Sequence, residues 1–361
     1  MGENSEKDYA GFKTILKNAV AAGASDIHLT TGWYPMFRLH GLLEKADENT
    51  LSHKFMENIA LRLMNDRQKT LFEKERTLDM GYSLESKRYR INCYFERGKI
   101  AIAIRHLDEK FQTLEGLHLP PQLAELAHLN HGLVLVSGAT GSGKSTTLAA
   151  LINEINITRN CHIITIEDPI EFIHDHHMSL IHQRELHTDV TDFSSAVRAS
   201  LREDPDVLLV GEMRDVETMR AALTAAETGH LVFSTLHTGS AVGVVERMIG
   251  TFPADEQVIA RHRLAMVLKA VVAQQLLPTM NGKGRIPAVE ILRVTKAVAN
   301  LIESDKSRQI HSAMESGQAE GMQTLEQSLV ALVREKWIDR QMARARARDP
   351  ENIDKLLRSY F

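Results

Sequence analysis

The segment GATGSGKST, residues 138–146, constrains the fold of this 361-residue chain more than any other feature. It follows the apolar run GLVLVSG, which is typical of a buried strand, and it opens a stretch with helical periodicity, residues 144–157. A glycine-rich loop in this context turns its backbone N–H groups inward at a helix N-terminus, where phosphates bind. The pattern therefore predicts a nucleotide-binding loop composed of Gly138, Ala139, Thr140, Gly141, Ser142, Gly143, Lys144, Ser145 and Thr146.

Two side chains of this loop have the chemistry that a nucleoside triphosphate requires. We expect the Lys144 ammonium group to reach the β- and γ-phosphates and the Ser145 hydroxyl to ligate Mg²⁺. A glycine-rich turn that only caps a helix is the alternative, and the strand before and the helix after favour the nucleotide site. The expected cofactors are ATP and Mg²⁺.

The chain after the loop has the pattern of a sheet covered by helices. Together with the run GLVLVSG before the loop, the continuously apolar runs CHIITIED, DVLLVGE and HLVFSTLH predict four buried strands, and helical stretches at 144–157, 193–203 and 215–227 separate them. This alternation predicts an α/β fold with a parallel sheet. From about residue 254 the pattern is mostly helical, with a helix expected at HRLAMVLKAVVAQQL and one more strand near PAVEILR.

The first hundred residues predict a smaller α/β module. Their clearest strand signal, KRYRINCYFERGKIAIAIRHL, alternates apolar and polar residues and turns at Arg97-Gly98, as a hairpin does. Residues 107–122 lose this periodicity and contain two adjacent prolines, which is typical of a linker. We expect an N-terminal domain over residues 1–106, this linker, and a nucleotide-binding domain over residues 123–361 whose helical part begins near residue 254.

Carboxylates follow two of the apolar strands. Glu167 ends one strand and Glu212 follows another, and parallel sheets bind ligands at the carboxyl ends of their strands. Either residue alone is also typical of a turn or a helix cap. Glu212 is the candidate general base or water-positioning group, and Glu167 is the second candidate. Because Gly211 stands where many NTPases have an aspartate, we expect Ser145, water and more distant carboxylates to hold Mg²⁺.

Composition excludes several classes of protein. The formal net charge of -4 argues against a basic protein that wraps nucleic acid, so no nucleic-acid partner is expected. The two cysteines, Cys93 and Cys161, are too few and too far apart for a disulfide framework or a cysteine-rich zinc site. The sequence shows no secretory signal and no apolar run of membrane-spanning length, so we expect a cytoplasmic protein. The clusters IHDHHMSL and MARARARD are interpreted as a solvated loop and a solvated helix face.

Four motifs in order, GATGSGKST, IEDPIEF, LLVGEMRD and TGHLVFSTLHT, resemble those of the secretion ATPases, which are hexameric motors of type IV pili, type II secretion and related machines. The resemblance covers nearly the whole chain and includes SDIHLTT and RYRINCYFERG near the N-terminus. Within that superfamily the chain is most similar to the retraction ATPases of type IV pili, through FPADEQ, VAQQLLP and EGMQTLEQSL. Assembly ATPases usually add an N-terminal region and a four-cysteine zinc motif, which two scattered cysteines cannot form.

This resemblance implies a fold and a function. The fold would be an N-terminal PAS-like domain plus a RecA-like P-loop ATPase domain with a helical C-terminal extension. The function would be ATP hydrolysis by a homo-hexamer that drives pilus retraction and twitching motility. The ring would act on an inner-membrane pilus platform protein, at the cytoplasmic face of the inner membrane, and would be peripheral to that membrane through its partners.

The resemblance also implies roles for individual residues. Glu212 and Glu167 would support hydrolysis, and two histidines and five arginines would contact nucleotide. The histidines would sense the γ-phosphate, and the arginines would close over nucleotide or lie near it. These residues are His230, His237, Arg90, Arg97, Arg105, Arg198 and Arg202.

One C-terminal stretch departs from the family pattern. Retraction ATPases resemble one another in AIRNLIRE, whereas residues 297–304 of this chain read AVANLIES. Ala299 replaces the first arginine, and Glu303 and Ser304 replace the final Arg-Glu pair. An accessory retraction motor, or another motor of the secretion superfamily, is therefore the alternative function. A nucleotide switch without turnover is a further alternative, which the presence of Glu212 and Glu167 disfavours.

Overall fold

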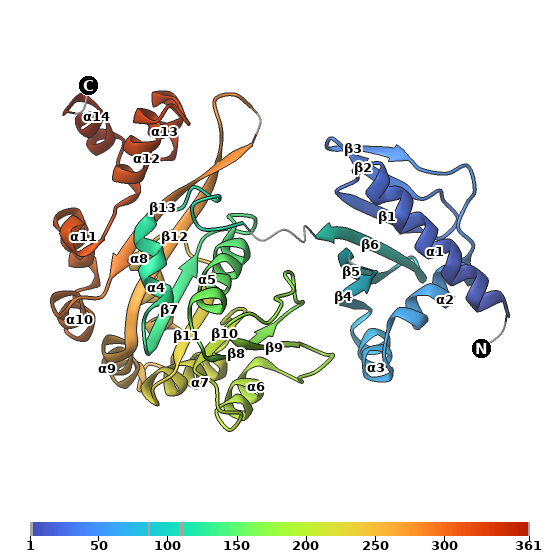
Figure 1. The fold of residues 1–361 in the computed structure, drawn as a ribbon, viewed down its shortest axis with the longest axis horizontal. Coiled ribbons are helices and arrows are strands. Elements are labelled where there is room, and N and C mark those ends of the chain that lie inside the picture. The colour runs from blue at the N-terminus through green and yellow to red at the C-terminus, as the bar shows by residue number, and fades with distance from the viewer. Residues whose placement is uncertain (1–2, 86, 108–111, 283, 360–361) are drawn as a thin grey trace. The chain divides into compact units, whose positions relative to one another are not determined.

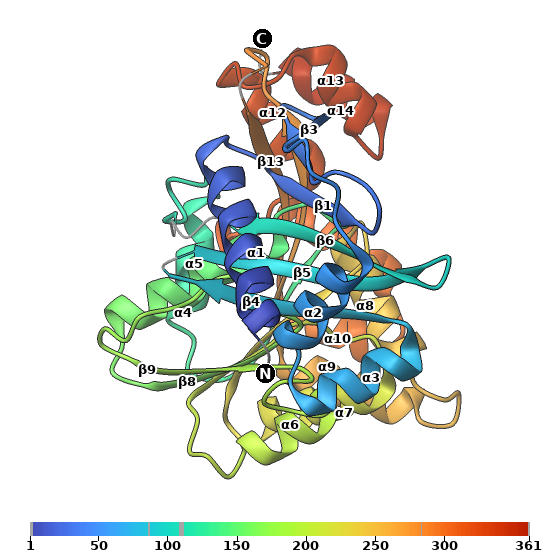
Figure 2. The same cartoon turned by 90° about the vertical axis from the view of Figure 1, so that its right-hand side faces the viewer.

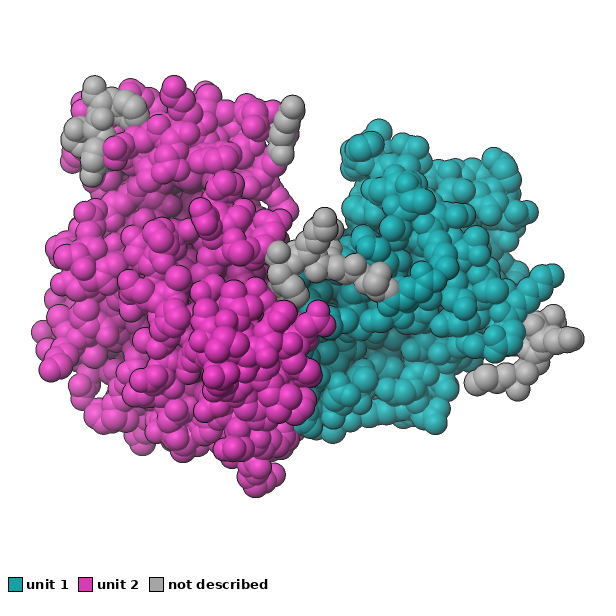
Figure 3. Space-filling view, in the orientation of Figure 1, with its two compact units in different colours: residues 1–110, 167–173, 183–192 teal, residues 111–166, 174–182, 193–361 magenta. Residues whose placement is uncertain are grey.

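In the computed structural model, residues 3–85, 87–107, 112–282 and 284–359 are described, and they form two compact units (Figures 1 and 3). Unit 1 comprises residues 1–110, 167–173 and 183–192. Unit 2 comprises residues 111–166, 174–182 and 193–361. The predicted linker includes residues 108–111, which lie outside the described residues.

Unit 1 contains a six-stranded antiparallel sheet and three helices. The strands are ordered β3-β2-β1-β6-β5-β4. Their bounds are β1 Asp26–Thr30, β2 Met36–Leu39, β3 Leu42–Lys45, β4 Thr77–Leu84, β5 Lys87–Glu96 and β6 Lys99–Leu107. The helices are α1 Glu3–Ala21, α2 His53–Leu63 and α3 Asp66–Glu75. Helices α1 and α2 lie over one face of this sheet (Figure 2), where Phe12 and Leu16 of α1 are fully buried.

The predicted hairpin of unit 1 is confirmed as β5 and β6. Their pairing closes at Glu96 and Lys99, so Arg97 and Gly98 form a two-residue turn. Both turn residues have positive φ, 50° and 77°, as the tight turns of hairpins require. Ile91 and Cys93 point from β5 into the core, because alternate residues of a strand face the same side.

A buried ion pair fixes two later segments of the sequence to unit 1. Arg88 of β5 donates to Glu185 at 2.5 Å, and the Glu185 carboxylate also accepts from the backbone N–H groups of Gly81 (3.1 Å) and Ile170 (3.2 Å). The Glu185 side chain is only 7% exposed, so these donors replace the water that it loses. Segments 167–173 and 183–192 therefore pack as parts of unit 1.

The second sheet has seven strands in the order β13-β12-β7-β11-β10-β8-β9. Strands β12, β7, β11, β10 and β8 are mutually parallel, and β13 is antiparallel to β12. The bounds are β7 Gly132–Ser137, β8 His162–Glu167, β9 Leu180–Glu185, β10 Val207–Val210, β11 Leu231–Leu236, β12 Leu268–Pro278 and β13 Arg285–Arg293. The four apolar runs predicted as strands are confirmed as β7, β8, β10 and β11, and the one near PAVEILR is confirmed as β13.

Helices cover this sheet and continue beyond it. The bounds are α4 Ala124–Ala127, α5 Lys144–Thr158, α6 Phe193–Ser200, α7 Val216–Glu227, α8 Ala241–Gly250, α9 Gln257–Val267, α10 Lys296–Glu303, α11 Ile310–Ser316, α12 Leu325–Arg334, α13 Arg340–Arg346 and α14 Pro350–Ser359. Short 3-10 turns are η1 Pro121–Leu123, η2 Ser307–Gln309 and η3 Gln318–Glu320. Among the described residues, no helix combines the length and the apolar character that are needed to cross a membrane.

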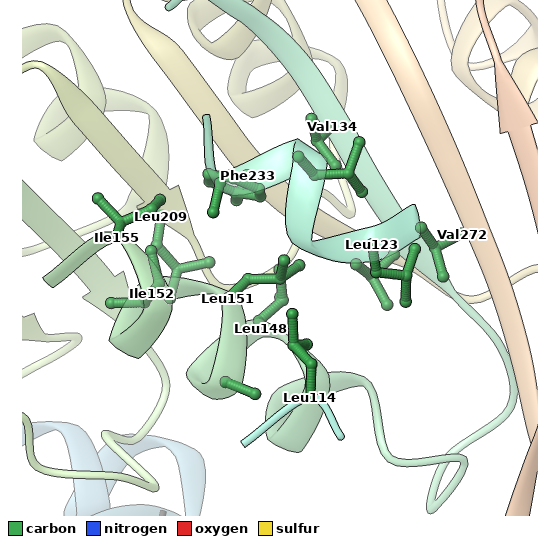
Figure 4. Packing of buried hydrophobic residues seen from close by; sticks show 14 of the residues in the cluster. Leu114, Leu123, Val134, Leu148, Leu151, Ile152, Ile155, Leu209, Phe233 and Val272 are labelled. Carbon is green, nitrogen blue, oxygen red and sulfur yellow. The ribbon is translucent and has the colours of Figure 1, made fainter. Parts of the chain in front are cut away.

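The core of unit 2 lies between the sheet and α5 (Figure 4). Leu148, Leu151 and Ile155 of α5 meet strand residues such as Val134 and Phe233, all of them buried. The predicted linker contributes to the same cluster, because Leu114 and Leu119 are buried in it. Burial of the apolar surface of this cluster favours folding, by about 25 cal/mol for each Å² that is removed from water.

The structure corrects the helix expected at HRLAMVLKAVVAQQL. Helix α9 ends at Val267, and the chain then enters β12, which pairs with β7 on one side and β13 on the other. Strand β12 is buried over most of its length, so its sequence is almost continuously apolar. A short apolar run of this kind has no period that separates a buried strand from a buried helix.

Candidate nucleotide site

The phosphate-binding loop follows β7 and leads into α5, as predicted. Its backbone requires glycine at three positions, since φ is 146° at Gly138, 77° at Gly141 and 89° at Gly143. A Cβ at Gly138 would lie 2.3 Å from the Gln274 carbonyl oxygen and 2.5 Å from the Ser142 hydroxyl. Gly143 occupies the position before the first residue of α5, so the loop ends at the helix N-terminus, where phosphates are stabilised.

Lys144 is the only cation among the loop residues, and it is 8% exposed. Its Nζ donates to the carbonyl oxygens of Gly138 and Ala139, each at 3.0 Å. The Ser142 hydroxyl is buried and has no hydrogen-bond partner among the described residues, and Ser145 is exposed at the start of α5. An ammonium group, a free buried hydroxyl and an exposed hydroxyl around glycine backbone fit a phosphate with a divalent cation.

A residue outside the motif supports the loop. The Gln274 side chain of β12 donates to the Ser142 carbonyl at 2.6 Å and accepts from the Thr147 hydroxyl at 2.9 Å. Gln274 is 5% exposed, so both hydrogen bonds form away from water. The sequence gives no local sign of this role, because Gln274 appears there only within VAQQLLP, a stretch that carries the family resemblance.

Glu212 and His237 lie at the same edge of the sheet as the loop. Register places Ser137 of β7 opposite Leu236 of β11, and Ser234 of β11 opposite Val210 of β10, so these strands end together. Glu212 lies just beyond the end of β10, and His237 comes directly after β11. The Glu212 carboxylate is 3.5 Å from His237 Nε2.

The segment that carries Glu212 is fixed by β11. The Thr235 hydroxyl donates to the Gly211 carbonyl at 2.7 Å, and the Met213 N–H donates to the Thr235 carbonyl at 3.2 Å. Arg214 also donates to Glu212 at 2.7 Å, and the Glu212 side chain is 15% exposed. Glu212 is therefore a partly buried carboxylate that is held between two cationic or potentially cationic partners.

Glu167 ends β8, the strand next to β10. Its Oε1 accepts from the Gln183 amide at 3.1 Å, and the same amide nitrogen donates to the Phe172 carbonyl at 2.8 Å. Gln183 therefore orients the carboxylate of Glu167, the second candidate for a role in hydrolysis.

Three of the predicted nucleotide contacts lie at the other edge of the sheet. His230 precedes β11 and its backbone carbonyl accepts from Gly132, the first residue of β7, at 3.0 Å. Six residues of β11 separate it from His237, a span of about 20 Å at strand rise. Arg198 and Arg202, both exposed, precede the start of β10. Unit 2 thus places Lys144, Glu212 and His237 at one edge of the sheet. His230, Arg198 and Arg202 lie at the opposite edge.

The three arginines predicted on the hairpin lie in unit 1, in ion pairs with nearby carboxylates. Arg90 contacts Asp79 at 2.5 Å and Glu171 at 3.4 Å. Burial lowers the pKa of Arg90, but the hydrogen bond and the charge of Asp79 raise it more, so the pKa is raised overall. Arg105 contacts Asp26 at 2.8 Å, and Arg97 at the turn is 90% exposed.

Metal ligation by protein side chains alone finds little support. Within the part of the chain that the structure describes, no three His, Cys, Asp or Glu side chains are grouped so that they could hold a metal ion. The histidines of IHDHHMSL behave differently from one another, because His174 is 8% exposed whereas His176 and His177 are exposed. The ligand that the loop offers to Mg²⁺ is the Ser145 hydroxyl, which suits an ion that carries most of its ligands as phosphate oxygens and water.

Comparisons with known proteins agree over nearly the whole chain. The family model of type II/IV secretion system proteins matches residues 9–352. The type IV pilus retraction ATPase PilT of Pseudomonas aeruginosa is 44% identical over 94% of this chain and 98% of its own. The type IV pilus ATPase PilU of the same organism is 36% identical over 96% and 91%.

A solved structure is similar as well. The crystal structure of the pilus retraction motor PilT with bound ADP has a TM-score of 0.86 and 40% sequence identity, and it covers 94% of this chain and 98% of that one. This likeness confirms the predicted fold class, an N-terminal domain plus a RecA-like ATPase domain with a helical C-terminal extension.

Proposed function

This chain belongs to the family of type II/IV secretion system proteins, and we propose that it is an ATP-hydrolysing motor that drives retraction of type IV pili. The observation that carries the proposal is the juxtaposition of the phosphate-binding loop with Glu212 and His237 at one sheet edge. The similarity to PilT over nearly the full length of both chains supports pilus retraction as the function of the motor.

The proposed chemistry uses few residues. Lys144 binds the β- and γ-phosphates and stabilises the charge that develops on the transferred group. Ser145 is the protein ligand for Mg²⁺, which would neutralise phosphate charge when bound. Glu212 orients the attacking water or accepts its proton, with Glu167 in support. His237, which contacts Glu212, is placed to report the state of the γ-phosphate to the loop that follows it.

The roles of the remaining predicted contacts stay predictions. We propose that Arg90, Arg97 and Arg105 approach nucleotide when the domains close, since guanidinium groups stabilise negative charge on phosphates. The positions of His230, Arg198 and Arg202 support contacts between neighbouring subunits better than contacts with Lys144 of the same chain, because they lie at the opposite sheet edge. Such contacts require an oligomer.

The proposed setting follows that of the similar motors. We propose a homo-hexamer with domains at residues 1–106 and 123–361 joined by residues 107–122. It would act on an inner-membrane pilus platform protein at the cytoplasmic face of the membrane, and would reach that membrane through its partners. We propose neither zinc nor nucleic acid as a ligand.

An accessory retraction motor is the second candidate, and the AVANLIES stretch favours it. In α10, Val298 and Ile302 are buried, while Glu303 contacts His262 of α9 at 2.9 Å. A carboxylate thus stands where the retraction group has an arginine. Against this candidate, identity to PilT is 44% and identity to PilU is 36%.

The test is Glu212→Gln in cells and in the purified protein. Glu217→Gln on α7 is the control, because Glu217 is 57% exposed and faces Arg220 rather than the site. Retraction predicts that Glu212→Gln abolishes ATP turnover with ADP binding retained, raises the number of surface pili and stops twitching. Fewer pili would indicate an assembly motor, and unchanged pili and motility would indicate an accessory motor or another secretion system.

A further inference from the structure

A fully buried carboxylate lies in β13. Glu290 is 0% exposed, and Arg348 forms a bidentate pair with it, at 2.9 Å from Nη1 and 2.5 Å from Nη2. Glu290 Oε2 also accepts from the Ala241 N–H, at the first residue of α8, at 3.2 Å. A buried carboxylate requires such partners, because an unpaired charge in the interior costs several kcal/mol.

Arg348 joins parts of the chain that are far apart in sequence. It lies between α13 and α14, within the run MARARARD, whose pattern predicts a solvated helix face. Arg344 and Arg346 are exposed on α13, as expected. Arg348 follows the helix, and although its side chain is 33% exposed, its guanidinium group pairs with Glu290 and its Nη2 also donates to the Gly239 carbonyl. The Arg348 backbone N–H donates to Glu326 of α12 at 3.0 Å, and Glu326 is 1% exposed. Arg348 thus connects the loop before α8, strand β13 and helix α12.

The loop that Arg348 holds begins at the nucleotide site. His237, next to Glu212, is its first residue, and Ser240, which caps α8 through the Gly243 N–H at 2.9 Å, is its last. A Cβ at Gly239 would have no atom within 4 Å, so packing does not restrain the loop at this point. Polar contacts do so instead: Arg348 binds the Gly239 carbonyl and Glu290 binds the Ala241 N–H.

We propose that Arg348 is a positioning residue for ATP hydrolysis: by fixing the Gly239 carbonyl it holds His237 against Glu212 and couples the C-terminal helices to the nucleotide site. Only two residues lie between His237 and Ser240, so a displacement of the Gly239 carbonyl also displaces the His237 imidazole. Through the Arg348–Gly239 hydrogen bond, a movement of the loop also displaces Arg348, whose backbone N–H is bonded to Glu326 of α12. The inference rests on the proposed ATPase function.

The experiment measures ATP turnover and ADP affinity of the purified full-length oligomer. Arg348→Met is expected to lower kcat about 10-fold, since a lost hydrogen bond to a charged group is worth that much, while the Kd for ADP changes less than about 2-fold. Arg344→Met is the matched control, because Arg344 on α13 is 62% exposed and contacts only the surface carboxylate of Asp354 among the described residues. It is expected to leave kcat unchanged.

Two further variants separate positioning from folding. Glu290→Gln combined with Arg348→Met removes the unpaired buried charge, so thermal stability should recover while kcat stays low. In a His237→Gln background, Arg348→Met should lower kcat no further, because the two residues act through one contact.

Recovery of kcat in the Glu290→Gln/Arg348→Met variant, or additive losses in the His237→Gln background, would overturn the inference. An equal loss of kcat in Arg344→Met would also overturn it. Failure of the wild-type protein to hydrolyse ATP would instead overturn the proposed function, and the inference with it. Wild-type turnover with a normal Arg348→Met variant would overturn the inference alone.

Discussion

Gln274 of β12 and Ser142 of the phosphate-binding loop are joined by a hydrogen bond of 2.6 Å between the side-chain amide and the backbone carbonyl. The same side chain accepts from Thr147 in the first turn of α5, so one glutamine joins the loop to the start of the helix that follows it. Hydrogen bonds from the neighbouring strand β12 thus fix the shape of the loop. This preorganisation lowers the cost of ordering the loop on binding.

Gln274→Met should therefore weaken nucleotide binding. It keeps the volume but removes two buried hydrogen bonds, each worth about 1 kcal/mol, so we expect an increase in the Kd for ADP of up to roughly 30-fold. Titration with a fluorescent ADP analogue measures this change. Gln275→Met is the matched control, because Gln275 is the next residue of β12 and makes no side-chain hydrogen bond to the loop within the described chain. Equal weakening in both variants would contradict the prediction.

The sequence predicts the parts of this molecule whose physics is local. Strands β7, β8, β10 and β11 are continuously apolar, and the loop after β7 contains its own glycines and lysine. Strand β12 escapes prediction because its apolar run suits a buried helix equally well. Gln274 escapes for a different reason: it is 132 residues away from Ser142 in sequence, and only strand pairing brings the two together.

The arginines show the same limit. Arg344, Arg346 and Arg348 follow one another in a single basic run, and nothing in the run marks Arg348 as the partner of a buried carboxylate. That partner, Glu290, is the one charged residue in the apolar run PAVEIL of β13. A carboxylate in an otherwise buried strand was the available signal, because such groups are retained only with a partner.

Breaking the Arg88–Glu185 pair should destabilise unit 1 far more than breaking a surface ion pair does. Arg88→Met leaves Glu185 buried without its cation, and we expect the free energy of unfolding to fall by about 3–5 kcal/mol. Lys17→Met removes an equally short pair with Glu85, in which both side chains are more than half exposed, and should cost less than about 1 kcal/mol. Chemical denaturation of the two variants tests the contrast. Similar losses in both would show that burial does not determine the strength of these pairs.

The two cysteines should differ in reactivity. Burial raises the pKa of the Cys93 thiol to about 12, with a smaller contribution from the charge of Asp79, and the side chain is inaccessible. Cys161 is partly exposed, with its Sγ 3.2 Å from the Ser179 hydroxyl. A chromogenic disulfide reagent at pH 8 should therefore label one thiol per native chain and two after denaturation. In the native Cys161→Ser variant no thiol should react, and labelling there would contradict the assignment.

His174 should make the protein sensitive to acid. Burial lowers the pKa of this imidazole from its ordinary value near 6.5 to about 4, while the charge of Asp175 opposes the shift. Between these two pH values the unfolded chain binds a proton that the folded chain does not, so stability is lost as the pH falls from about 6.5 to about 4. At pH 5 the loss relative to pH 7 should be about 2 kcal/mol. Urea denaturation at pH 5 and pH 7 should show this loss in the wild type. The control His128→Gln should show the same loss, because His128 is exposed. In His174→Gln the loss between the two pH values should be smaller by about 2 kcal/mol. An unchanged pH dependence in His174→Gln would show that other groups cause the acid sensitivity.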